Sequence, residues 1–221
     1  MDTARKIRNH FGKPSIIGML PSLKMNAMIK WESLLERDCA ILLEASRAVK
    51  SFWSQPFTFE YWDGQKYRIY TPDFLVELPN KVLVEVKPAT KLENYASRYK
   101  SISEECSKND LPFVVLTEKQ IRVQPKLDNI KLLYRYAWTQ VTLDEGLACR
   151  KIFQENHVVS LGAFQALLAK RGLPQELAYH LMYRQEIDFD VNLPITKDSI
   201  LGWRRKGDTL CMHLDLNTDS A

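Results

Sequence analysis

Residues 71–89 read TPDFLVELPNKVLVEVKPA, and this stretch constrains the fold more than any other part of the chain. Two apolar runs, FLVEL and KVLVEVK, flank a Pro-Asn pair and predict two buried strands joined by a tight turn. Three charged residues, Asp73, Glu85 and Lys87, lie at the edges of these runs or within them. Burying a charge is costly unless the charge is paired or binds a metal. These side chains therefore either face solvent or form a site.

The register of the two strands decides between these alternatives, because alternate side chains of a strand share a face. A three-residue loop sets Asp73 opposite Glu85 or Lys87, depending on where the loop begins. A two-residue loop sets Asp73 opposite Val86 instead and separates the two acids. We predict the register of the three-residue loop, with the three charges on one face and the valines of the second strand buried on the other.

In that register the three side chains suit metal-assisted hydrolysis of a phosphodiester bond. Asp73 and Glu85 offer hard oxygen ligands for Mg²⁺ or Mn²⁺. Lys87 can orient a water, help to deprotonate it, or stabilise charge on a phosphate. The spacing is the PD-(D/E)xK nuclease pattern: Pro72-Asp73, eleven residues, then Glu85-Val86-Lys87. The competing interpretation is a solvated hairpin face with a Glu–Lys pair.

An amphipathic helix is predicted over residues 32–46, where apolar side chains recur at helical spacing around Cys39, which we expect in the core. Ser33 and Glu36 have the spacing of a capping box, which would bind the Glu36 carboxylate to the backbone N–H of Ser33. Glu36 also stands in a row of otherwise small or apolar side chains, which favours a role as a further acid of the site. Both interpretations stay open here.

The remaining patterns predict an α/β domain over residues 25–140. Alternating aromatic residues around Asp63-Gly64 indicate a β-hairpin, residues 91–108 are compatible with a helix, and residues 113–116 form a short buried strand. A mixed sheet flanked by helices follows, and the resemblance to the PD-(D/E)xK pattern implies that it is a restriction-endonuclease-like core.

Helical patterns replace strands after about residue 140. Residues 143–154, 161–171 and 175–185 are predicted helices, and residues 187–203 a small hairpin. We therefore expect a mostly helical, winged-helix-like domain over residues 141–206 and a C-terminal tail over residues 207–221. Such a domain either reads DNA or docks a protein, and docking is slightly favoured.

The charge distribution predicts a basic arm, and the cysteine content predicts a reducing compartment. The net charge is +4 and the pI about 8.8. Residues 1–24 are expected to be a basic arm that either is solvated or contacts DNA phosphates through Arg5, Lys6, Arg8 and Lys13. The four cysteines have no metal-ligand spacing and no apolar run approaches membrane-spanning length, so we expect a cytoplasmic protein.

Five blocks in order carry a resemblance to a known family. They are WESLLERD (31–38), WSQPFTFEY (53–61), YTPDFLVEL (70–78), VEVKPA (84–89) and VLTEKQIR (115–122). Together they resemble the TnsA family, the endonuclease subunit of heteromeric cut-and-paste transposases, over about residues 25–140. The resemblance implies catalytic roles for Glu36, Asp73, Glu85 and Lys87, with the three acids at a Mg²⁺ site.

The resemblance also implies a biological setting. A subunit of this kind cleaves double-stranded DNA at the 5′ ends of a transposon, while a separate DDE-type transposase subunit cuts and joins the 3′ ends. An AAA+ regulator ATPase is the other implied partner, contacted through the C-terminal part. Two alternatives stay open: a stand-alone restriction, repair or phage nuclease, and a catalytically idle DNA-binding scaffold.

Overall fold

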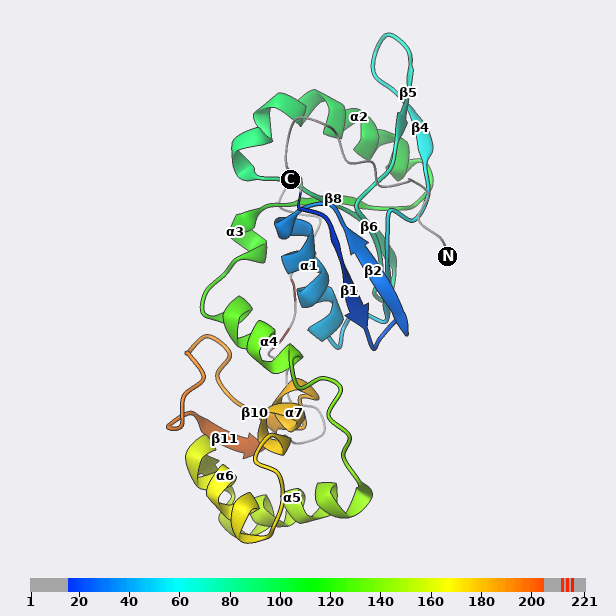
Figure 1. The fold of residues 1–221 in the computed structure, drawn as a ribbon. Helices are drawn as coiled ribbons and strands as arrows, with labels where there is room; N and C mark the ends of the chain where they lie inside the picture. Colours follow the sequence, from blue (N-terminus) through cyan, green and yellow to red (C-terminus); the bar gives the residue numbers. More distant parts are fainter. Residues whose placement is uncertain (1–15, 205–211, 213, 215, 217–221) are drawn as a thin grey trace. The chain divides into compact units, whose positions relative to one another are not determined.

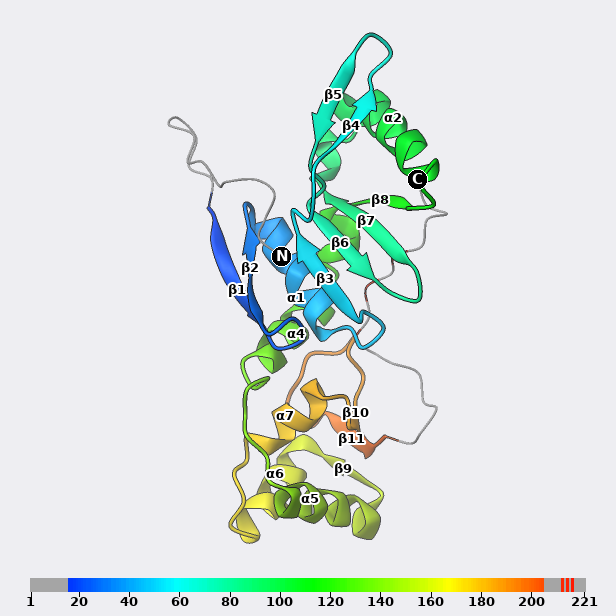
Figure 2. The ribbon, with the colours of Figure 1, turned by 90° about the vertical axis from the view of Figure 1, so that its right-hand side faces the viewer.

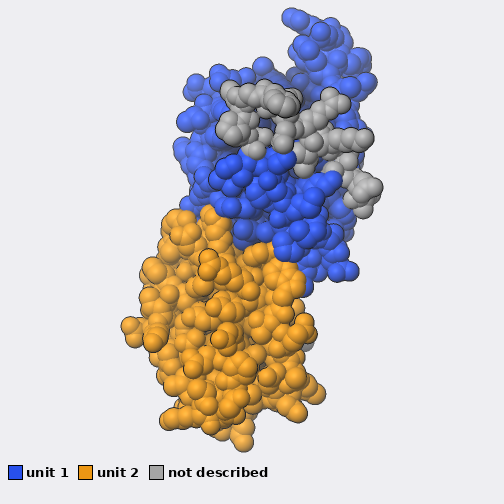
Figure 3. Space-filling view, in the orientation of Figure 1, with its two compact units in different colours: residues 1–123, 214–221 blue, residues 124–213 orange. Residues whose placement is uncertain are grey.

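The structure is a computed structural model in which residues 16–204, 212, 214 and 216 are described. The chain divides into two compact units, residues 1–123 with 214–221 and residues 124–213 (Figure 3). The predicted arm residues Arg5, Lys6, Arg8 and Lys13, and most of the predicted tail, lie outside the described residues.

The first unit is built on a four-stranded mixed sheet (Figures 1 and 2). Its order is β3 (Ser51–Ser54), β6 (Phe74–Glu77), β7 (Lys81–Val86) and β8 (Phe113–Leu116). The β3–β6 and β6–β7 pairs are antiparallel, and β7–β8 is parallel. The mixed α/β character predicted from the sequence is confirmed.

The register between β6 and β7 is the one that the site requires. Phe74 pairs with Val84 and Val76 with Val82, so the loop spans residues 78–80 and Asp73 stands opposite Glu85. Val82, Val84 and Val86 are all at most 6% exposed. The predicted three-residue loop is confirmed, and the charged positions of these strands share one face.

Helices cover the sheet on both of its faces. Leu75 and Leu83, which share the face of Asp73, pack with Tyr99 and Ile102 of α2 (Ala96–Ser107). The opposite face carries the buried valines of β7, and α1 (Leu34–Ala45) contacts that strand. Two 3₁₀ turns, η1 (Ala89–Lys91) and η2 (Glu93–Tyr95), precede α2, and α3 (Glu118–Ile121) follows β8. The predicted helix over residues 91–108 therefore begins later than expected.

An N-terminal hairpin corrects the predicted extent of the basic arm. Strands β1 (Gly18–Ser22) and β2 (Ala27–Trp31) are antiparallel, and both contact α1. Lys24 in their turn is not solvated: its ammonium donates hydrogen bonds to the carbonyls of Leu43 and Ser46 at 2.7 and 2.6 Å. No hairpin was predicted here, because Pro21 interrupts the alternating pattern of the first strand.

A second hairpin stands apart from the four-stranded sheet. Within the described residues, strands β4 (Phe59–Trp62) and β5 (Tyr67–Tyr70) pair only with each other, and β4 contacts α2. Asp63 at the predicted turn accepts hydrogen bonds from the backbone N–H groups of Gln65 and Lys66, both at 2.9 Å. Figure 1 shows this hairpin extending beyond the sheet beside α2.

The second unit contains four helices and a small sheet among the described residues. The helices are α4 (Lys126–Tyr134), α5 (Leu143–Asn156), α6 (Leu161–Lys170) and α7 (Leu177–Tyr183). Strands β9 (Val158–Ser160), β10 (Ile187–Asp188) and β11 (Ile200–Trp203) pair antiparallel in the order β10-β11-β9. The three predicted helices and the hairpin are confirmed, and the winged-helix class stays a prediction.

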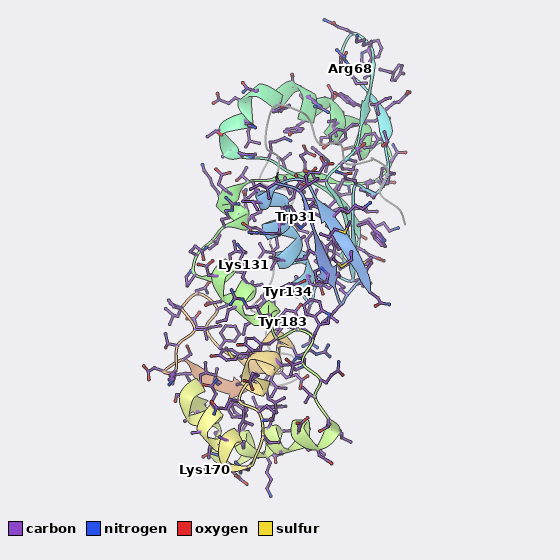
Figure 4. The ribbon with its side chains drawn as sticks, in the orientation of Figure 1. Trp31, Arg68, Lys131, Tyr134, Lys170 and Tyr183 are labelled. Atoms are coloured by element: carbon purple, nitrogen blue, oxygen red, sulfur yellow. The ribbon has the colours of Figure 1, made fainter. Side chains whose placement is uncertain are left out.

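The division between the units falls at residues 123–124, earlier than the predicted residue 140. The reason is α4, whose contacts lie with α7. Tyr134 packs edge-on against Tyr183 with 6.3 Å between ring centroids (Figure 4), and Asn129 donates hydrogen bonds to the carbonyls of Val191 and Leu193.

In the described part of the chain, no helix combines the length and the apolar character needed to cross a membrane.

Candidate functional site

The four predicted site residues line one cavity of about 380 Å³ in the first unit. Asp73, Glu85 and Lys87 come from the β6–β7 pair, and Glu36 comes from the first turn of α1. Five further residues complete the lining: Glu32, Ile69, Tyr70, Thr71 and Arg98. The structure thus brings together all four predicted residues and adds a tyrosine and an arginine to them.

Asp73 is held by the backbone on both sides of its strand. Its Oδ2 accepts a hydrogen bond from the backbone N–H of Val86 at 2.8 Å, which places the carboxylate beside β7. Its carbonyl accepts one from the N–H of Gln55 at 2.9 Å. Burial, followed by the charges of Glu85 and Glu36, raises the pKa of Asp73 well above its usual range. The carboxylate is therefore fixed in a place that favours a nearby cation.

Glu85 is 5% exposed and is surrounded by donors. Tyr70 donates its hydroxyl hydrogen to Oε2 at 2.5 Å, and Tyr99 donates to Oε1 at 3.2 Å. Burial, and then the charge of Glu85, raises the pKa of both tyrosines, so both hydroxyls keep their protons. These two residues fix the orientation of the carboxylate. In the sequence they appear only as aromatic residues of a hairpin and a helix, a pattern that predicts core positions.

Lys87 forms an ion pair with Glu85, with 3.2 Å between Nζ and Oε1. Its Nζ also lies 5.5 Å from the ring centroid of Tyr95. Burial by itself lowers the pKa of Lys87, but the charges of Glu85 and Asp73 outweigh burial and raise it. The side chain is therefore a cation at neutral pH, held within the acidic cavity.

Glu36 forms hydrogen bonds at the start of α1 and also lines the cavity. Ser33 is the N-cap of α1, and its hydroxyl accepts a hydrogen bond from the N–H of Glu36 at 3.1 Å. The Glu36 carboxylate binds the N–H of Glu32 at 2.7 Å and the hydroxyl of Ser33 at 2.9 Å, rather than the N–H of Ser33 as predicted. Burial, opposed by these hydrogen bonds and aided by Glu32 and Glu85, raises the pKa of Glu36.

Arg98 is a site residue that sequence reasoning did not find. Its guanidinium carbon lies 5.3 Å from the ring centroid of Tyr70. Its Nε is buried and has no hydrogen-bond partner among the described residues. A single arginine in a polar helical segment gives no local signal, because its position depends on how α2 packs against the hairpin.

The donor set fits Mg²⁺ bound chiefly by two carboxylates. Among the described residues, no group of three or more His, Cys, Asp or Glu side chains is already spaced as a metal-binding cluster. Mg²⁺, however, often uses one or two carboxylates and completes its shell with waters and substrate phosphates. Asp73 and Glu85 stand opposite each other, and the raised pKa of Asp73 reflects its burial and then the negative charges of Glu85 and Glu36, which a cation would neutralise.

Residues 46–118 match the family described as TnsA-like endonuclease N terminal. The matched stretch contains Asp73, Glu85 and Lys87, whereas Glu36 and the second unit lie outside it. No curated protein matches the chain. The family match confirms the resemblance inferred from the sequence blocks over this stretch, and it points to a nuclease of the transposase type.

Proposed function

We propose that this chain is a Mg²⁺-dependent DNA endonuclease and the TnsA-like subunit of a transposase complex, hydrolysing phosphodiester bonds at the 5′ ends of a transposon. One observation carries the proposal: the register that sets Asp73 opposite Glu85, in a cavity that also contains Lys87 and Glu36. The family match over residues 46–118 supports the nuclease class independently of this geometry.

The side chains divide the chemistry between them. Asp73 and Glu85 would hold the ion, and Glu36 is the acid that can complete the set from α1. When bound, Mg²⁺ supplies Lewis-acid polarisation of the scissile phosphate, and Mn²⁺ is expected to substitute for it. Lys87 orients the attacking water or stabilises negative charge on the phosphate. Tyr70 and Tyr99 hold Glu85 in place through their hydroxyls.

The proposed substrate is the double-stranded DNA of the transposon ends. The proposed partners are a separate DDE-type transposase subunit and an AAA+ regulator ATPase, and the second unit is the part proposed to contact a partner. The basic residues Arg5, Lys6, Arg8 and Lys13 would add contacts to DNA phosphates.

The decisive experiment compares Asp73→Asn with Lys87→Ala. Asp73→Asn should abolish Mn²⁺ binding measured by calorimetry and should lower DNA cleavage in a reconstituted reaction by about 100-fold or more. Lys87→Ala should keep most of the Mn²⁺ affinity but lose cleavage to a similar degree. The difference is expected because the ammonium acts on water or phosphate and not on the ion.

Lys81→Ala is the matched control, since Lys81 is an exposed lysine at the opposite end of the same strand, where it pairs with Glu77. It should cut at the wild-type rate. Wild-type cleavage by Asp73→Asn would refute the assignment of the carboxylate cavity as the catalytic site, and equal loss of Mn²⁺ affinity in the two site variants would refute the division of roles. Full cleavage by the chain without any partner subunit would favour a stand-alone nuclease.

A further inference from the structure

A second cavity adjoins the carboxylate cavity in the first unit. It has a volume of about 560 Å³ and lies between the β4–β5 hairpin and α2. Ile69 and Arg98 line both cavities, so the two adjoin each other at these side chains. Figure 4 places Arg68, another lining residue, on the projecting hairpin. We call this second cavity the hairpin groove.

Hydrogen-bond donors dominate the walls of the hairpin groove. From α2 come the hydroxyls of Ser97 and Ser101, one helical turn apart, and the guanidinium of Arg98. The hairpin contributes Gln65 and Arg68. Guanidinium, hydroxyl and amide donors are the groups that bind phosphate and sugar oxygens of DNA.

Among the described residues, the one carboxylate that lines the hairpin groove is already neutralised. Asp63 Oδ2 accepts a hydrogen bond from Arg68 Nε at 2.5 Å, and its Oδ1 accepts two backbone N–H groups of the turn. The hydrogen bond from Arg68, followed by those backbone bonds, lowers the pKa of Asp63 to about 2. Its negative charge is therefore balanced within the hairpin turn, and the hydrogen-bond donors of α2 are available to bind an anion.

Arg98 stands where the two cavities meet. Its ring contact with Tyr70 fixes the guanidinium, and the structure gives it no ion pair with any described carboxylate. The buried Nε without a partner is a donor that a ligand oxygen would satisfy. On the groove side a phosphate would meet the donors of α2. On the cavity side it would meet the ammonium of Lys87 beside the carboxylates of Glu32, Glu36, Asp73 and Glu85, whose negative charge a bound cation would offset.

We propose that the hairpin groove carries the DNA strand that enters the carboxylate cavity, and that Arg98 binds a phosphate beside the scissile one. This inference rests on the proposed nuclease function and names the route and contact of its substrate. Arg98 is thereby a substrate-positioning residue. The contact is to the sugar-phosphate backbone of the DNA, so it gives no preference for any base sequence.

The test measures binding of a short fluorescent duplex to the full chain by anisotropy over a series of salt concentrations. Arg98→Met keeps the aliphatic stem over Tyr70 and removes the charge. It should weaken binding by about 10-fold at low salt and lower the slope of log affinity against log salt by about 1. Arg98→Lys should restore the slope, because it keeps the charge.

Lys100→Met is the matched control, because Lys100 is an exposed cation on the same helix that lines neither cavity. It should leave affinity and slope about unchanged. Thermal melting of each variant checks that the fold is intact. Equal affinity and slope for Arg98→Met and the wild type would overturn the inference, and so would a wild-type chain that fails to bind duplex DNA at low salt.

Cleavage assays separate this inference from the proposed function. If Asp73→Asn is inactive while Arg98→Met binds and cuts as the wild type does, the groove assignment fails and the nuclease stands. If Asp73→Asn cuts normally while Arg98→Met binds DNA weakly, the carboxylate cavity is not the catalytic site, and the groove stands as a DNA-binding surface.

Discussion

Asp73 lies close to other negative charges in the carboxylate cavity. Its carboxylate is held beside β7 by the N–H of Val86, near the like charges of Glu85 and Glu36. Repulsion of this kind is a cost to the fold that a bound cation removes. Asp73→Asn keeps an oxygen acceptor for that N–H and removes a charge, so loss of cleavage in this variant should not be accompanied by loss of stability.

Glu36→Gln separates the two roles of that residue. Glutamine keeps one oxygen that can accept the hydrogen bond from the N–H of Glu32, and its amide group can donate to the hydroxyl oxygen of Ser33 in place of the bond accepted there. The helix start should therefore survive, and the free energy of unfolding should change by less than about 0.5 kcal/mol. If the carboxylate also serves the metal site, cleavage should fall by about 10-fold or more.

Urea denaturation and the reconstituted cleavage assay measure the two effects in the same preparation. A stable Glu36→Gln variant that cuts at the wild-type rate would return Glu36 to a purely structural role. The matched change Glu32→Gln, at a residue that also lines the cavity, tests whether either acid contributes only through its charge.

At the residue scale, spacing alone identified the members of the site that belong to one strand pair. Asp73, Glu85 and Lys87 follow from strand alternation, because a two-residue period fixes which side chains share a face. Tyr70 and Arg98 could not be found in this way. Each reaches the cavity from an element that is brought to the sheet by tertiary packing, and an isolated Tyr or Arg gives no spacing to recognise.

At the scale of elements, the β1–β2 turn is attached to the C-terminal end of α1. Glu44 accepts hydrogen bonds from the backbone N–H groups of Leu23 and Lys24 and from the hydroxyl of Ser22. Lys24 in turn binds two carbonyls at the end of α1, where a cation is favoured by the helix dipole. None of this was predicted, since Lys24 was assigned to a basic arm that either is solvated or contacts DNA phosphates.

The Lys24 contacts predict a pH dependence of stability. Burial, only partly offset by Glu44, lowers the pKa of Lys24 from its usual value of 10.5 to about 8. Between these values the unfolded chain binds the proton more tightly, so the contribution of Lys24 to stability rises from pH 8 to pH 10.5 and is lost again as pH falls back to 8. The free energy of unfolding of the wild type, relative to Lys24→Met, should therefore rise by on the order of 1–2 kcal/mol across this range.

Urea titrations of both proteins at several pH values measure this difference, and subtracting the variant removes the other titrating groups. Lys50→Met, at an exposed lysine, should show no such trend relative to the wild type. A wild-type advantage that is constant with pH, or that shrinks as pH rises, would contradict the assigned pKa.

The elements missed in the sequence share a physical cause. Strand β9 has three residues and β1 contains Pro21, so neither gives a clear two-residue period. Helix α4 was not predicted, and the expected boundary at residue 140 placed its residues in the first domain, because its apolar residues do not reveal that they pack on α7. Longer elements with strong periodicity, such as α1 and β7, were found within two residues of their ends.

At the scale of the whole molecule, each unit has a buried core of its own. Leu83 in the first unit and Leu168 in the second are both 0% exposed. If the units unfold separately, Leu83→Ala and Leu168→Ala should each lower one calorimetric transition and leave the other in place. The loss for each should be about 2–5 kcal/mol, the usual cost of deleting buried leucine atoms.

Differential scanning calorimetry of the two variants and their double mutant measures this outcome. Effects at independent sites add, so the double mutant should show both shifts together. A single transition that both substitutions lower equally would mean that the chain unfolds as one cooperative unit, with the division at residues 123–124 having no thermodynamic counterpart.

The β4–β5 hairpin is fixed at one end and open at the other. Tyr70 packs against the rings of Phe59, Tyr61 and Phe113 and binds Glu85, whereas a side chain added at Gly64 would meet nothing within 4 Å. The tip of the hairpin can therefore accept inserted residues more easily than the base can. Under the proposed function, residues inserted at the tip would lengthen the reach of the hairpin along a duplex while the base keeps the Glu85 carboxylate aligned. The length of DNA that is bound could then change separately from the catalytic site.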